Sequence, residues 1–181
     1  MTGALLSSYT AHFPWSTGAA SITVVGADAG TLEDLYEYAL ELRDRWDTAD
    51  PDSDVARVAA ARPVPTSESQ LLAAVARDAL GVPLNALAEA LAVDLIAGEA
   101  EATDAVGWWI RVGAAARAAG ACPVADGWQF DLPRGEAAPS WVSVRAGGIA
   151  VAAEDDSRPG ACACAPHAWI AMREAFQLHA R

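Results

Sequence analysis

The chain has 181 residues with 24 acidic and 12 basic side chains, which gives a net charge of −12. This charge repels polyanions, so we expect no nucleic-acid partner and no contact with an anionic membrane. The length suits one domain, and a hydrophobic content of 53% is too high for a disordered chain. Three cysteines, an odd number, do not make a disulfide framework. Since no segment resembles a signal peptide or a membrane span, we expect a cytoplasmic protein.

The first half of the chain predicts one strand followed by helices. Residues 19–26 are rich in β-branched side chains, which predicts a strand that ends at Gly26. Leucine and tyrosine recur at helical spacing after Thr31, so we expect a helix from there to the polar turn that contains Pro51. Further helical segments are predicted at 55–61, 67–80 and 84–95.

The second half predicts strands and a closing helix. Apolar runs separated by Gly and Pro turns predict strands at 108–112, 128–132, 141–145 and 148–153. A helical period begins near Pro166 and continues to the C-terminus. Because helices and strands interleave, we expect an α+β fold, with helices packed on a mixed sheet in a single domain over residues 1–181. Residues 1–12 and 153–165 are expected to be flexible.

Residues 43–58 carry a resemblance to a known family. They read Arg-Asp-Arg-Trp-Asp-Thr-Ala-Asp-Pro-Asp-Ser-Asp-Val-Ala-Arg-Val, which places a Pro-Asp-Ser-Asp turn after a helix with an aromatic end. This resembles the early part of the FAD:protein FMN transferases, the ApbE or thiamine biosynthesis lipoprotein family. There a similar helix end is followed by Pro-Asp-Ser-Glu and Ser-Arg-Leu-Asn. The N-terminal match covers residues 13–80.

Residues 83–94 carry a second match, Pro-Leu-Asn-Ala-Leu-Ala-Glu-Ala-Leu-Ala-Val-Asp. They resemble the family's flavin-binding helix entry, Asp-Leu-Gly-Gly-Ile-Ala-Lys-Gly-Tyr-Ala-Val-Asp. The apolar positions and Asp94 agree, but the two family glycines are Asn85 and Ala86, and the family lysine is Glu89. An anion in place of a cation repels the phosphates of a cofactor. The resemblance implies that Asn85, Glu89 and Asp94 occupy the former flavin site.

Two weaker matches add to this former site. Residues 110–115 resemble the family's Val-Asn-Leu-Gly-Gly-Asp turn and keep one glycine, Gly113. Residues 165–171 resemble the Ala-Asp-Ala-x-x-Thr turn, whose Asp and Thr hold magnesium in the family; here these positions are His167 and Ala171. Magnesium requires hard oxygen ligands, so His167 marks a former metal position that an imidazole does not rebuild.

The resemblance as a whole implies a shortened and degenerate member of the family, because some family segments have no counterpart in this sequence. We expect the scaffold to serve as a binding or assembly protein without a cofactor. Its partner would be another protein, a flavoprotein or a second copy of the chain. The alternative is an active magnesium-dependent FAD:protein FMN transferase, or a flavin-binding protein, that uses FAD and Mg²⁺ in a rebuilt site. Whether the chain is an enzyme stays open.

Three other patterns have both a functional and a structural interpretation. Cys162, Cys164 and His167 form C-x-C-x-x-H, which with a fourth ligand would suit zinc or copper; the alternative is a loop of small residues. The acidic segment 47–54 lacks the glycine and distal glutamate of a calcium loop, which favours a solvated turn. The tryptophan pair at 108–109 faces both sides of a strand, and core packing is favoured over a ligand pocket.

Overall fold

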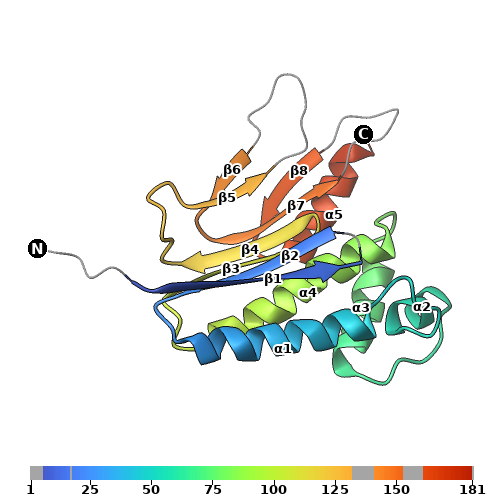
Figure 1. Cartoon of the computed structure of the whole chain (residues 1–181). Helices are drawn as coiled ribbons and strands as arrows, with labels where there is room; N and C mark the ends of the chain where they lie inside the picture. The colour runs from blue at the N-terminus through green and yellow to red at the C-terminus, as the bar shows by residue number, and fades with distance from the viewer. Residues whose placement is uncertain (1–5, 17, 132–140, 153–160, 181) are drawn as a thin grey trace, which may run out of the picture.

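A computed structural model describes residues 6–16, 18–131, 141–152 and 161–180. Its centre is a six-stranded sheet with the order β1-β2-β3-β4-β7-β8, and β5 and β6 form a second, two-stranded sheet. Figure 1 shows the helices on one side of the large sheet and the small sheet on the other. The strands are β1 (Ser8–Trp15), β2 (Gly18–Val25), β3 (Gly107–Val112), β4 (Ala115–Gly120), β5 (Trp128–Asp131), β6 (Trp141–Val144), β7 (Gly147–Ala152) and β8 (Ala161–Ala165). The helices are α1 (Ala29–Arg45), α2 (Asp54–Ala59), α3 (Ser67–Asp78), α4 (Leu84–Glu101) and α5 (Ala168–His179).

The large sheet is antiparallel at every strand pair that the structure describes, where a mixed sheet was expected. One reason is the connectivity: β1–β2 and β3–β4 are each separated by only two residues, and strands joined by so short a connection can pair only antiparallel. In sequence, helices α1 to α4 all come between β2 and β3. The two strands are nevertheless neighbours in the sheet, where Val25 pairs with Gly107. The α+β fold class is confirmed.

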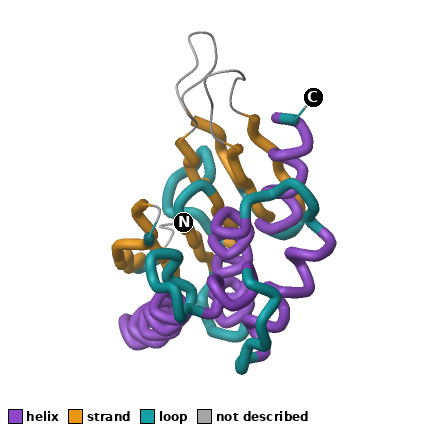
Figure 2. Tube along the Cα trace, turned by 90° about the vertical axis from the view of Figure 1, so that its right-hand side faces the viewer, coloured by secondary structure: helices purple, strands orange, loops and turns teal. Residues whose placement is uncertain are grey.

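Helix α4 is the centre of the helical layer. Ten of its residues are buried, and they include Leu87, Leu91 and Ile96. A helix that is apolar on most of its circumference must be covered on all sides. Here α4 packs against β3 and β4, and it also contacts α1, α3 and α5. Figure 2 shows the helices grouped together beside the strands. No helix among the described residues is long and apolar enough to cross a membrane.

Helix starts follow ordinary capping chemistry, but one of them differs from expectation. The carboxylate of Asp28 accepts the backbone N–H of Thr31 at 2.8 Å and caps α1, so this helix begins at Ala29, before the expected start at Thr31. Helix α3 begins after Thr66, whose hydroxyl accepts the N–H of Ser69. His167 precedes α5 and makes no capping hydrogen bond with its side chain.

The second face of the large sheet is covered by β5 and β6. Trp109 stacks on Trp128 with ring centroids 6.0 Å apart, and Phe130 meets Trp109 edge to face. Trp108 belongs to the cluster on the helical side. The two adjacent tryptophans therefore lie on opposite faces, and both are core residues, which confirms the packing interpretation.

Three strands were missed from the sequence, and two of them lie in segments expected to be flexible. β1 pairs with β2 over its whole length, so Ser8–His12 belong to the sheet. β8 pairs with β7 over residues 161–165, which places this segment in the sheet as well. Residues 1–5 and 153–160 lie outside the described part of the chain. The third missed strand is β4, in an alanine-rich segment.

Candidate functional site

Helix α4 and the turn between β3 and β4 bring Glu89 and Gly113 together. Glu89 is only 4% exposed, and its Oε2 accepts the backbone N–H of Ala114 at 3.3 Å. Gly113 has φ +52°, and a Cβ built there would collide with the Glu89 carboxyl group. A side chain at residue 113 would therefore displace this carboxyl, and the positive φ also favours glycine there. Two of the four residues assigned to the former flavin site are in direct contact.

Burial changes the acid chemistry of Glu89. Removal of the carboxyl from water raises its pKa from 4.5 to about 7, and the hydrogen bond from Ala114 opposes this shift only in part. A carboxyl of this kind carries a proton for part of the time at neutral pH. It is a poor neighbour for a phosphate when ionised, and it fills the turn in either state.

Asp94 joins α4 to the start of α5. Its Oδ1 accepts the backbone N–H of Ala168 at 3.0 Å, and its Oδ2 accepts that of Trp169, also at 3.0 Å. The N–H groups of a first helical turn have no partner within the helix, and a carboxylate there also interacts favourably with the helix dipole. Asp94 thus caps α5 from another helix, and both of its oxygens are engaged.

Arg117 on β4 completes the surroundings of Asp94. Its guanidinium lies 3.4 Å from Asp94 Oδ1 and 2.8 Å from Glu101 Oε1, and it stands over the ring of Trp108. Burial raises the pKa of Asp94, while the two backbone N–H groups, Arg117 and His167 lower it. Arg117 was not identified from the sequence, because it lies beside α4 only after β4 has paired with β3.

The remaining two site residues are less engaged. Asn85 is exposed in the first turn of α4. His167 is about half exposed, and its Nδ1 lies 3.6 Å from Asp94 Oδ1. Within the described residues, no three His, Cys, Asp or Glu side chains are placed to hold a metal ion. The structure thus puts His167 beside Asp94, and its imidazole nitrogen is not one of the hard oxygen ligands that magnesium prefers.

The cysteine motif does not assemble with His167 in this part of the chain. Cys162 and Cys164 are free thiols two residues apart on β8, and they share one side of the strand. Burial raises the pKa of both thiols, to about 11 for Cys162.

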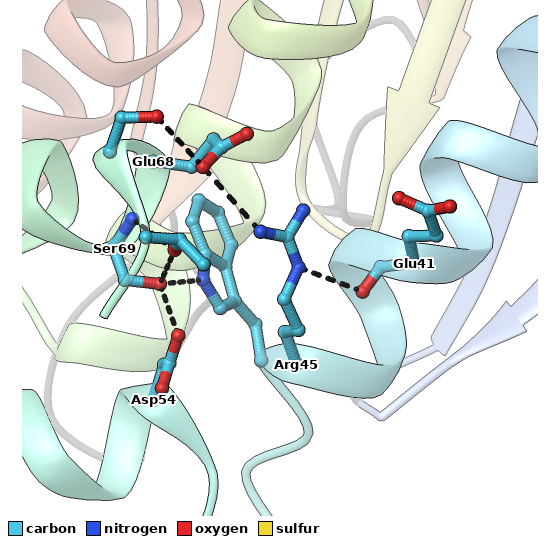
Figure 3. Close-up of polar contacts among 8 residues, drawn as sticks. Glu41, Arg45, Asp54, Glu68 and Ser69 are labelled. Carbon is cyan, nitrogen blue, oxygen red and sulfur yellow. Dashed lines mark hydrogen bonds and ion pairs between the residues drawn. The ribbon is translucent and has the colours of Figure 1, made fainter. Parts of the chain in front are cut away.

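A buried polar network connects Asp54, the last residue of the acidic segment 47–54, to helix α3 (Figure 3). The Ser69 hydroxyl donates to Asp54 Oδ2 at 2.6 Å and accepts the indole N–H of Trp46 at 2.9 Å. Asp47 and Asp50 instead accept backbone N–H groups two residues further on. The acidic side chains therefore shape turns and join α2 to α3, which agrees with a turn rather than a calcium loop. Ser69 was not singled out from the sequence.

The similarity of this chain to known proteins lies in its fold. No protein-family model and no curated protein sequence matches the chain. The apo form of the flavinyl transferase ApbE from Pseudomonas stutzeri is similar in structure, with a TM-score of 0.68 and 14% identity over 98% of this chain and 86% of that one. The flavin transferase ApbE from Vibrio cholerae has a TM-score of 0.67 and 14% identity over 96% and 86%. Its H257G mutant has a TM-score of 0.64 and 14% identity over 95% and 86%.

This likeness extends over nearly the whole chain. The chain has the ApbE fold. At 14% identity the fold is conserved while side chains are free to differ, so the chemistry of the site must be judged from the residues themselves.

The site residues do not suit the FAD and magnesium that an ApbE-type transfer implies. The Ala114 N–H already binds Glu89, and both oxygens of Asp94 already bind α5. A diphosphate next to these two carboxyl groups would meet negative charge, with Arg117 already paired to two acids.

Proposed function

We propose that this ApbE-fold protein has lost flavin transfer and serves as a binding or assembly protein. The observation that carries this proposal is Glu89. A carboxyl group fills the turn at Gly113 and takes the Ala114 N–H. In a flavin-transferase site, that position would need to favour an anion.

Two further contacts support the proposal. The second carboxylate of the former site, Asp94, caps α5 and pairs with Arg117, so it has a structural task that needs no ligand. His167 is the only part of the former metal turn with a coordinating side chain, because Ala171 has a methyl group. A site of this composition keeps the helices together but lacks the ligands for metal-assisted phosphoryl chemistry.

The competing function is an active FAD:protein FMN transferase with a rebuilt site, which the similarity in fold favours. The test is the release of AMP from FAD in the presence of Mg²⁺ and a flavoprotein whose Thr or Ser hydroxyl accepts the FMN. It is followed by chromatography, with the Vibrio cholerae flavin transferase acting on the same acceptor as positive control. We expect no AMP above the protein-free blank. Turnover that is abolished by Asp94→Ala and retained by Asp78→Ala, an exposed aspartate at the end of α3, would establish the transferase instead.

Binding without chemistry is tested separately. Titration calorimetry with FAD and with FMN, each with Mg²⁺, should give no saturable heat, and the purified protein should have no visible flavin absorbance. Flavin binding by the wild type that is lost in Asp94→Ala would contradict the closed site. A binding or assembly role also predicts a protein partner or a second copy of the chain, which light scattering of the purified protein and of its complexes would detect.

A further inference from the structure

A groove lies between the end of α2 and one face of α3, away from the site described above. Its volume is about 610 Å³, within the range of about 300–1,000 Å³ that small-molecule sites occupy. Most of its lining is aliphatic, and its polar groups are one amide and two guanidinium groups. The lining residues are Val58, Ala61, Arg62, Pro63, Val64, Gln70, Ala73, Ala76 and Arg77.

The walls of this groove are held by buried hydrogen bonds. The bond from Ser69 to Asp54 joins α3 to α2, and the bond from Trp46 ties both helices to the end of α1 (Figure 3). Ser69 is completely buried, and Asp54 is 7% exposed. Buried bonds of this kind are costly to break, so the groove is formed before any ligand arrives.

The turn after α2 has an unfavourable backbone conformation at Ala61, next to the groove. Ala61 is the only residue other than glycine with a positive φ, +53°, in the described part of the chain. The Ala61 N–H donates to Val58 O and the Arg62 N–H donates to Arg57 O, which is the Schellman pattern that usually has glycine at this position. This conformation brings Ala61 and Arg62 to the edge of the groove.

The charge of the groove is opposite to that of the chain. All 12 basic residues of the sequence are arginines, and the sequence has 24 acidic residues. The guanidinium groups of Arg62 and Arg77 form no ion pair and no hydrogen bond with the described residues, although Arg43, Arg45 and Arg117 each pair with a carboxylate. Two unpaired arginines over an aliphatic floor provide both charge and apolar contact for one ligand.

We propose that this groove binds a small amphiphilic anion, namely an organic acid with an aliphatic body. The guanidinium groups of Arg62 and Arg77 pair with the carboxylate, because guanidinium matches carboxylate geometry and is weakly hydrated. The alanine and valine side chains of the floor cover the aliphatic body. This site shares no residue with the one around Glu89, so the proposal of an anion site does not depend on the proposed function.

The test is a titration of the ¹⁵N-labelled protein followed by NMR, with hexanoate as the probe. Hexanol supplies the same body without charge, and acetate supplies the charge without the body. The variants are Arg62→Gln and Arg77→Gln, and Arg145→Gln is the matched control, since it removes an exposed arginine outside the groove. Circular dichroism verifies that each variant is folded, and because all three positions are exposed we expect no change in fold.

Hexanoate should shift the amide signals of the lining residues in a saturable way. It should bind about tenfold or more tightly than either hexanol or acetate, and each groove variant should lose about tenfold in affinity while the control keeps it. The proposal is overturned if hexanoate gives no saturable shift or if hexanol binds equally well. It is also overturned if acetate matches hexanoate or if the control variant loses as much affinity as Arg77→Gln.

Discussion

Replacement of Glu89 by glutamine should make the stability of the protein less dependent on pH. In the folded chain the pKa of Glu89 is about 7, against 4.5 for an ordinary glutamate. The raised pKa means that the folded state holds the proton more tightly than the unfolded state. The contribution of Glu89 to the free energy of unfolding is therefore fully present below about pH 4.5 and is lost as pH rises through 7. The loss is about 3 kcal/mol in total. Glu89→Gln keeps the shape of the side chain and removes this loss.

The assay is urea unfolding followed by tryptophan fluorescence at several pH values from 5 to 8. The stability of Glu89→Gln relative to wild type should rise by about 2–3 kcal/mol across this range. Asp94 also has a raised pKa, but it is present in both proteins and cancels in the difference. Glu37→Gln, at an exposed position on α1, is the matched control. A stability difference for Glu89→Gln that stays constant from pH 5 to pH 8 would refute the burial argument.

Three other variants test separate contacts. Ser69→Ala leaves the Trp46 N–H and the Asp54 carboxylate without their buried partner, and urea unfolding should show a loss of about 2–4 kcal/mol. Ala61→Gly relieves the positive φ and should raise stability by up to about 1 kcal/mol, whereas a loss would mean that no strain is stored there. Asp94→Ala should speed amide hydrogen exchange in the first turn of α5, and unchanged exchange would show that this cap is dispensable.

The elements that could be predicted from the sequence are those with strong local signals. Helix α1 and strands β2, β3 and β7 have periodic or β-branched patterns, and each lies within a few residues of its expected position. Strand β4 reads Ala-Ala-Arg-Ala-Ala-Gly, a composition that locally favours helix, and only pairing with β3 and β7 on both sides makes it a strand. Strand β1 contains Pro14, which is tolerated because this strand lies at the edge of the sheet.

The site was predicted in part, and only through resemblance. The motif positions placed Glu89 and Gly113 in one site, and the structure brings them into contact. The partners of Asp94 could not be predicted, because its hydrogen bonds reach residues 168 and 169, far along the chain. Arg117 was missed for the same reason. Long-range contacts of this kind depend on strand register, which a single sequence does not reveal.

The insertion of four helices between adjacent strands has a consequence for how the chain folds. Strands β1 and β2 can form their hairpin locally, but β2 meets its second partner only when Gly107 reaches Val25. Closing so long a loop is entropically costly, so the joining of the two halves of the sheet should be late and slow. During synthesis on the ribosome the hairpin therefore emerges with one edge still open. A chaperone that shields exposed strand edges would find its substrate at that stage.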